Sequence, residues 1–343
     1  MTMMDLNRKL EKLTEILRAI DTLIVAFSGG VDSTFLLLYA RKIFAEGDPN
    51  GRDYAAASGS AEDIDDGTRH EGSDNKRNKL LAVTADGPNF VPDEIAYAQK
   101  LCRVNDIEHM CIDLGDRLLG EIKGNTPERC YICKKYIFAD IIEKVNGYLA
   151  PCSGQEFADG TNADDIEDYR SGRKALAELG IRSPLAEAGL TKKEIRRALR
   201  DILSEHARHL DEPYSIHTED LQNNVSKHGT TGKTAACKLS DAGLGIWDKP
   251  ASACLASRVP YGEELTHGKL EAIYAAELAL KNLGFEQVRV RCHGDLARIE
   301  VMPDDIIRFY DIVFMDEVSR IIRNCGFKYV SLDLTGYVMG NMN

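Results

Sequence analysis

The sequence predicts an α/β protein in which a parallel sheet flanked by helices is followed by a smaller α+β unit. Short apolar runs alternate with helical patterns through residue 203, as is typical of βαβ units. A turn of small polar residues joins the first of these runs to an apolar helix. Beyond residue 241, two strand patterns meet across a tight turn between helical segments, which indicates the second unit.

Size and charge limit the functions that are open to the chain. Its 343 residues suffice for one large or two moderate domains. A net charge of −12 argues against a broad nucleic-acid surface. We see no apolar stretch of membrane-spanning length and no secretory leader, so we expect a cytoplasmic protein without a membrane partner. In that compartment, nine cysteines indicate metal or sulfur chemistry rather than disulfides.

The chain begins with the elements around which the rest is organised. Residues 6–20 place leucine and isoleucine at helical spacing, which predicts an amphipathic helix. Residues 22–27 form an apolar run with β-branched members, typical of a buried parallel strand. Residues 34–43 are almost wholly apolar and predict a buried helix.

The turn between that strand and helix is suited to binding phosphate. Gly29 and Gly30 allow the backbone to approach a ligand closely, and Ser28 and Ser33 add hydroxyl groups. The helix start supplies unpaired N–H groups and the positive end of the dipole. Asp32 is an anion like phosphate, so we expect it to hold Mg²⁺ instead. The alternative is an ordinary turn in which Asp32 and the serines cap the helix.

The pattern continues with further strands and helices after an interruption. Residues 47–78 are rich in Gly, Ser, Asp and Asn, and they predict a disordered insertion. Strands are then expected at 79–84 and 107–112, with a helix at 92–102 between them. Asp86 follows the first of these strands, at the sheet edge where ligands of such folds bind.

Two polar motifs complete the first unit, which we assign to residues 1–203. Cys130 and Cys133 form a CxxC pair at the start of a helix that is expected to run to about residue 145. An acid-rich loop at 157–165 follows a strand interrupted by proline and glycine. Residues 174–179 predict a short helix, and residues 191–203 predict a cationic helix that opens with a capping box.

The remaining chain divides into a polar insertion at 204–240 and a second unit at 241–343. A loop bounded by prolines at 247–262 carries Cys254, Ser257 and Arg258. Residues 285–292 alternate valine with Arg289 and Arg291, which predicts a half-buried strand with two arginines on one face. The other elements expected here are helices at 266–283 and 304–324 and strands at 297–302 and 327–332.

These motifs together resemble those of a known family. The Ser28–Ser33 turn, Ser-Gly-Gly-Val-Asp-Ser, is similar to the pyrophosphate loop of the ATP-pyrophosphatase (PP-loop) superfamily, whose sheet is Rossmann-like. The loop Gly160-Thr-Asn-Ala-Asp-Asp is shared with several of its members. The stretch Lys249-Pro-Ala-Ser-Ala-Cys-Leu-Ala-Ser-Arg258, with Arg289, Arg291 and Glu300, narrows the resemblance to the LarE-type ATP-dependent sulfur transferases.

The resemblance implies a reaction, its cofactors and its site residues. A carboxylate of a pyridinium-3,5-biscarboxylic acid mononucleotide would be adenylated by ATP with Mg²⁺, and sulfur would then displace AMP to give a thiocarboxylate for the nickel-pincer cofactor. The resemblance also implies a homo-oligomer. The residues that it assigns to ATP or Mg²⁺ are Ser28, Gly29, Gly30, Asp32, Ser33, Asp86, Asp159 and Asp164. Those assigned to the substrate and its chemistry are Cys254, Ser257, Arg258, Arg289, Arg291 and Glu300.

The source of the sulfur is open between several readings of the cysteines. Cys130, Cys133 and Cys254 could hold a four-iron cluster and leave one iron free for a sulfide. Cys254 could instead give up its own sulfur and remain as dehydroalanine. A zinc site would need a fourth ligand, and the CxxC pair could also be a redox disulfide or structural.

Other functions stay in competition with this one. A tRNA thiolase or an amide-forming synthetase of the same superfamily would share the phosphate loop. The acidic net charge and the lack of an added RNA-binding module argue against the first, and no glutaminase motif supports the second. A nucleotide- or metal-binding protein without turnover is the rival of another class. Release of pyrophosphate that depends on the pyridinium substrate distinguishes them.

Overall fold

The computed structural model describes residues 3–46, 78–149, 154–167, 171–209, 246–248 and 253–338. Most of the two predicted insertions, 47–78 and 204–240, lies outside the described residues. Residues 249–252 of the loop at 247–262 also lie outside them. No helix within the described ranges is both long and apolar enough to cross a membrane.

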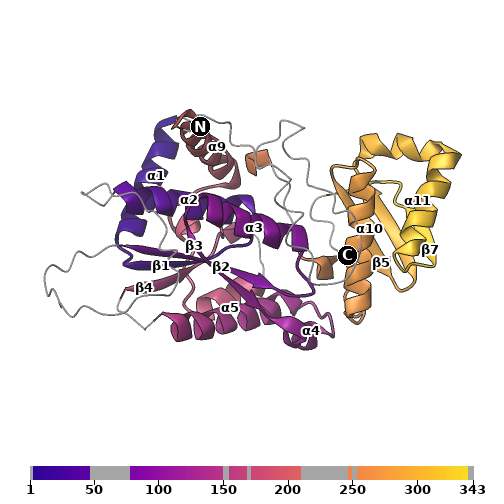
Figure 1. Ribbon diagram of the computed structural model, residues 1–343, viewed down its shortest axis with the longest axis horizontal. Helices are drawn as coiled ribbons and strands as arrows, with labels where there is room; N and C mark the ends of the chain where they lie inside the picture. The colour runs from indigo at the N-terminus through magenta and orange to yellow at the C-terminus, as the bar shows by residue number, and fades with distance from the viewer. Residues whose placement is uncertain are drawn as a thin grey trace, which may run out of the picture.

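A four-stranded parallel sheet forms the centre of the first unit (Figure 1). Its order is β3-β2-β1-β4, with β1 at Thr22–Ala26, β2 at Lys79–Asp86, β3 at Glu108–Asp113 and β4 at Gln155–Ala158. The chain therefore moves outward from β1 to β3 and returns to the other side of β1. Ligands of such sheets bind where the order reverses, which here is beyond the carboxyl ends of β1 and β4.

Both faces of this sheet are covered, because alternate side chains of each strand point to opposite sides. Leu23 and Val25 pack with helices α1, α2, α3 and α9, whereas Ile24 and Leu81 pack against α4 and α5. Figure 1 shows α2 and α3 on one side of the sheet and α4 and α5 on the other. The helices of this unit are α1 (Met3–Arg18), α2 (Val31–Glu46), α3 (Pro92–Val104), α4 (Gly115–Ile122), α5 (Arg129–Tyr148), α6 (Ala163–Glu167), α7 (Ser171–Glu178), α8 (Pro184–Glu187) and α9 (Lys192–His209).

The second unit is a three-stranded sheet with helices. Strand β5 (Val288–His293) pairs antiparallel with β6 (Leu296–Val301), as predicted, and β7 (Tyr329–Leu332) adds in parallel to β6. The helices are α10 (His267–Asn282) and α11 (Ile312–Asn324), and the short 3₁₀ helices are η2 (Ile246–Asp248), η3 (Leu255–Arg258) and η4 (Pro303–Tyr310). The predicted α/β fold with a smaller α+β unit is confirmed.

The two units share one hydrophobic core. Buried residues of α4 and α5 belong to the same cluster as Leu255, Val259 and the inner residues of β5 and β6. The backbone joins them as well, because Gly262 N donates to Asn125 O at 3.0 Å and Leu265 N donates to Lys123 O at 3.0 Å. The loop that carries Cys254 is thus packed against the first sheet.

Several local features differ from expectation, among them the short helices α6 and α8, which were not predicted. Helix α4 was not predicted. The single helix expected at 304–324 is instead η4 and α11, divided at Asp311, whose side chain accepts a hydrogen bond from Val313 N at 2.9 Å and caps α11. Helix α9 continues to His209, past the expected end at residue 203. Its predicted capping box is present, since Thr191 N donates to Glu194 Oε2 at 2.8 Å.

Candidate active site

The phosphate loop is built as its residue types require. Gly29 has a φ of +69°, and a Cβ there would lie 3.1 Å from the carbonyl oxygen of Glu94, so the position needs glycine. Ser28 Oγ lies 3.2 Å from Ser33 Oγ and accepts a hydrogen bond from Gly30 N at 3.4 Å. Two hydroxyl groups therefore line the start of α2, beside its unpaired N–H groups and the positive end of its dipole. This arrangement suits a bound anion.

The loop after β4 lies directly against the phosphate loop. A Cβ on Gly160 would come within 2.8 Å of Ser33 N and 3.1 Å of Ser33 Cα, so the two backbones touch there. Asn162 Nδ2 also donates to Asp32 Oδ2 at 3.3 Å. The structure therefore brings together two predicted motifs that lie more than a hundred residues apart in the sequence.

Asp32 has one oxygen engaged and one available. Lys192 Nζ lies 3.3 Å from Asp32 Oδ2, and Lys192 N donates to Asp164 Oδ2 at 2.8 Å. Oδ1 of Asp32 is buried and has no hydrogen-bond partner. Burial raises the pKa of Asp32, although the charge of Lys192 opposes the shift. An unpartnered carboxylate oxygen beside a phosphate site fits a Mg²⁺ ligand.

The other two acids predicted to serve ATP lie at the same edge of the sheet. Asp159 accepts hydrogen bonds from Ser183 Oγ at 2.7 Å and Thr161 Oγ1 at 2.6 Å, and Lys134 Nζ lies 3.7 Å away. These contacts indicate that Asp159 shapes its loop. Asp86 ends β2, where burial raises the pKa of its carboxyl. A contact of either acid with ATP stays a prediction.

Two of the three predicted cluster cysteines lie in the first two turns of α5, and the third precedes η3. Asn89 connects the two places: its Nδ2 lies 3.9 Å from Cys133 Sγ, and its carbonyl oxygen accepts a hydrogen bond from Leu255 N at 2.9 Å. The side chain of Asn89 is 1% exposed, and its Oδ1 has no partner. Asn89 thus contacts the thiol of Cys133 with its side chain and the residue after Cys254 with its backbone.

The environment of Cys133 disfavours a thiolate in the chain alone. Burial raises the pKa of Cys133 to about 12, and the charges of Cys254 and Cys130 add to the shift, whereas Arg129 and Lys134 oppose it. Within the described residues, no group of three or more His, Cys, Asp or Glu side chains is arranged to hold a metal ion. Thiols are the ligands that iron–sulfur clusters take, so the donor type fits a cluster, and the cluster stays a prediction.

Arginines from three elements hold four carbonyls of the turn that carries Cys254. Arg258 Nη1 donates to the carbonyl oxygens of Ala253 at 2.6 Å and Cys254 at 3.0 Å. Arg291 Nη1 donates to the carbonyl of Ser257 at 2.9 Å. Arg129 of α5 donates to the carbonyl of Ala256, the residue before Ser257, at 2.9 Å. The turn is therefore fixed from both units.

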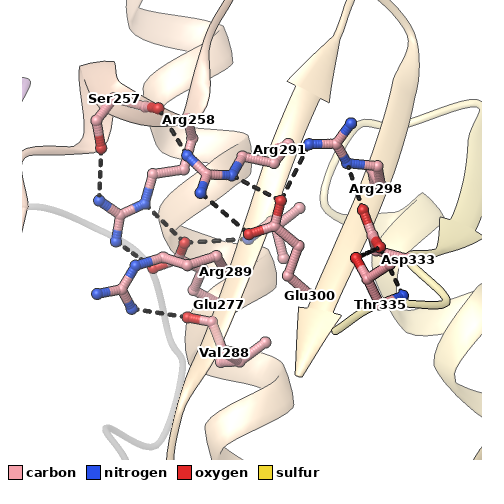
Figure 2. Close-up of polar contacts among 11 residues, drawn as sticks. Ser257, Arg258, Glu277, Val288, Arg289, Arg291, Arg298, Glu300, Asp333 and Thr335 are labelled. Carbon is pink, nitrogen blue, oxygen red and sulfur yellow. Dashed lines mark hydrogen bonds and ion pairs between the residues drawn. The ribbon is translucent and has the colours of Figure 1, made fainter. Parts of the chain in front are cut away.

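Buried carboxylates pair with two of these arginines (Figure 2). Glu277 of α10 accepts from Arg258 Nε at 2.9 Å and Nη2 at 3.0 Å, and it also accepts from Val290 N at 3.1 Å. Glu300 of β6 accepts two hydrogen bonds from Arg291, both at 3.0 Å. Arg298 adds a third bond to Glu300 at 3.0 Å, so Glu300 pairs with two arginines, and its predicted role toward the substrate stays a prediction.

The expectation of a half-buried strand is wrong for β5. Arg289 and Arg291 are only 8% and 7% exposed, because α10 and η3 cover the strand. Arg289 Nη1 donates to the carbonyl of Val288 at 2.8 Å, and its guanidinium lies 5.4 Å from the ring centre of Tyr337. Burial lowers the pKa of Arg289, and the charge of Arg258 lowers it further. Ser257 Oγ donates to the carbonyl of Cys254 at 2.8 Å.

Four residues of the site were not found from the sequence. Lys192 was counted only as part of a cationic helix, and Glu277 only as part of a helix pattern. Arg129 and Asn89 carried no motif. Each acts through a partner that is distant in the chain, and only the position of Arg129 next to Cys130 could have drawn attention to it.

Comparison with known proteins finds three relatives, two of which match almost the whole chain. No protein-family profile matches the chain. A pyridinium-3,5-bisthiocarboxylic acid mononucleotide synthase of Lactiplantibacillus plantarum is 31% identical over 99% of this chain and 96% of its own length. An uncharacterized protein of Synechocystis is 32% identical over 98% of both chains. An uncharacterized protein of Methanocaldococcus jannaschii is 26% identical over 64% of this chain and 68% of its own.

Proposed function

Because the chain belongs to the LarE-type family of pyridinium-3,5-bisthiocarboxylic acid mononucleotide synthases, within the PP-loop superfamily, we propose that it is a cytoplasmic sulfur transferase of nickel-pincer cofactor synthesis. Its substrate would be a pyridinium-3,5-biscarboxylic acid mononucleotide. ATP would activate the carboxylates, and sulfur would replace an oxygen of each to give thiocarboxylates.

The observation that carries this proposal is the phosphate loop with its available acid. The triphosphate of ATP would lie over Gly29 and Gly30, against the N–H groups at the start of α2 and the hydroxyls of Ser28 and Ser33. Asp32 would hold Mg²⁺ through Oδ1, which has no partner in the protein. Bound there, Mg²⁺ supplies charge that offsets the phosphate oxygens.

Activation solves a problem of leaving groups. A carboxylate has no acceptable leaving group, so its oxygen would attack the α-phosphorus of ATP and release pyrophosphate. A sulfur nucleophile would then attack the carbonyl carbon of the acyl adenylate, and AMP would leave with the bonding electrons. The protein's part is to hold both reactants in line and to stabilise the phosphate charge.

The sulfur would come from a site that Cys130, Cys133 and Cys254 would form together. We favour thiolate ligation of a four-iron cluster by these three residues. When bound, such a cluster offers one iron without a protein thiolate, which can carry a sulfide. The alternative is direct use of the Cys254 sulfur, which would leave dehydroalanine in the chain.

The arginine group suits the phosphate of the substrate. Figure 2 shows four guanidinium groups, of Arg258, Arg289, Arg291 and Arg298, against three carboxylates, of Glu277, Glu300 and Asp333. The group therefore carries an excess of one positive charge in a mostly buried setting, where an anion is bound strongly. We propose that Arg289 and Arg291 contact the substrate phosphate, with Ser257 and Arg258 alongside.

Two measurements test the proposed function. The purified chain should release pyrophosphate and AMP only when ATP, Mg²⁺ and the pyridinium nucleotide are all present. Asp32→Asn should abolish this release. Release that depends on tRNA or on ammonia instead, or no release at all, would refute the proposal. Intact-mass analysis after turnover separates the sulfur sources, because sacrifice removes the mass of H₂S at Cys254 and a cluster leaves the chain intact.

We also propose that the chain forms a homo-oligomer through η4 and α11. Large apolar side chains are exposed there, namely Ile307, Tyr310, Ile312 and Val313, which are 64%, 77%, 68% and 72% exposed. A group of adjacent exposed apolar residues is typical of a surface that another protein covers. Light scattering of wild type and of Val313→Asp should give a lower mass for the variant, and a monomeric wild type would contradict this.

A further inference from the structure

Arg129, the first residue of α5, carries a buried positive charge without a carboxylate partner among the described residues. Its side chain is 2% exposed. The guanidinium donates to Asn125 Oδ1 and to the carbonyl of Ala256, and it lies 5.1 Å from the ring centre of Tyr261. All three partners are neutral, and Arg129 Nε is buried with no hydrogen-bond partner. A buried cation of this kind is costly unless an anion neutralises it.

A small cavity adjoins this charge. Its volume is about 90 Å³, and Arg129, Asn125 and Thr126 contribute to its polar lining. The volume is below the range of about 300–1,000 Å³ that drug-sized ligands need, so the cavity suits a small ion rather than a nucleotide. It also lies at the N-terminal end of a 20-residue helix, where the dipole favours negative charge.

The other residues that line the cavity limit which class of anion it can bind. Ile122 and Ile132 form apolar walls, which favour a weakly hydrated, polarisable ion. Glu121 also lines the cavity and is exposed, so it repels polyanions such as phosphate more than it repels a monoanion. The place is close to the cysteines, because Arg129 precedes Cys130 and binds the carbonyl two residues after Cys254.

We propose that this cavity, lined by Arg129, Asn125 and Thr126, is a binding site for a small monoanion and that hydrosulfide is its occupant during turnover. The anion site stands on the buried guanidinium and the cavity alone. Its assignment to hydrosulfide rests on the proposed sulfur transfer.

Bromide is the probe for the anion site. Crystals of the full chain soaked in sodium bromide should show an anomalous peak in the cavity for wild type and for Arg129→Lys, and none for Arg129→Met. Glu121→Gln, which changes an exposed residue and removes the negative charge, should raise the occupancy. If Arg129→Met fails to fold, Thr126→Val tests the same lining and should weaken the peak. A cavity without bromide in the wild type, or a peak unchanged in every variant, would overturn the proposal.

The occupant is tested by kinetics with sodium hydrosulfide as sulfur source. At saturating ATP, Arg129→Lys should raise the KM for hydrosulfide about tenfold, the effect of losing one good charge-assisted hydrogen bond, and leave the KM for ATP unchanged. Glu121→Gln should lower the hydrosulfide KM. A bromide site with unchanged hydrosulfide KM values would refute hydrosulfide as the occupant. No thiocarboxylate from the wild type under any condition would refute the proposed function, while the bromide result would still decide the anion site.

Discussion

Replacing Glu277 by glutamine should strongly destabilise the protein, because its carboxylate is the buried partner of Arg258. Glu277 is 4% exposed and Arg258 is 2% exposed, and two hydrogen bonds of 2.9 and 3.0 Å join them. Removing one charge from such a pair leaves the other buried, which costs about 3–5 kcal/mol. The amide of glutamine can still accept one of the bonds, so we expect about 3 kcal/mol. At about 2–4 °C per kcal/mol, Tm should fall by about 6–12 °C.

The matched control is an exposed ion pair with a similar distance between its nitrogen and oxygen atoms. Lys123 Nζ lies 2.8 Å from Glu264 Oε1, but the two side chains are 61% and 54% exposed. Glu264→Gln should leave the free energy of unfolding almost unchanged, because solvent screens an exposed pair. The assay is urea unfolding followed by circular dichroism, with a thermal melt alongside. The double variant Arg258→Met/Glu277→Gln should recover part of the loss, because it removes the unpaired charge. A Glu277→Gln effect as small as that of Glu264→Gln would refute the reasoning.

Three further predictions concern the loops and strands around the site. Arg289→Ala should raise the KM for the pyridinium nucleotide much more than that for ATP in initial-rate assays, and equal effects would reject a substrate clamp. Gly160→Ala should raise the KM for ATP at least tenfold, because the new Cβ would lie 2.8 Å from Ser33 N. Gly120→Ala is the control, since a Cβ there has no atom within 4 Å, and its KM for ATP should not change. Similar KM values for both variants would contradict the predicted contact. Burial lowers the pKa of His109 below its unfolded value of about 6.5, so the free energy of unfolding should decrease as pH falls through 6.5 towards the folded pKa. The Tm values measured at pH 7.5 and 5.5 should therefore differ less in His109→Gln than in wild type.

The fold could be read from the sequence where the elements are strongly patterned. The apolar runs before the phosphate loop and after residue 78 are typical of buried parallel strands, and they became β1 and β2 with bounds close to those predicted. Helix α4 was missed because Gly115 and Gly120 lower its helix propensity, although Leu118, Leu119 and Ile122 fill the core.

The site was predictable only where its residues form local motifs. The phosphate loop and the acid-rich loop were identified by their own sequences, and their contact through Gly160 follows from the strand order. The alternation of valine and arginine in β5 is equally consistent with an exposed and a covered face. The carboxylates of Glu277 and Glu300 neutralise the buried Arg258 and Arg291. Both glutamates lie on other elements, so no pattern within β5 reveals them.

The fixed turn around Cys254 determines which partner has to move. Guanidinium groups hold four of the five carbonyls from Ala253 to Ser257, so the backbone that carries the Cys254 thiol is fixed and cannot move the thiol between two targets. If the chain acts as proposed, a nucleotide with carboxylates at ring positions 3 and 5 would have to present them one after the other to a stationary sulfur. Either the nucleotide would rotate about its bound phosphate between the two transfers, or it would dissociate after the first thiolation and rebind with its second carboxylate towards the sulfur. A singly thiolated compound in the surrounding solution would be the trace of the second route.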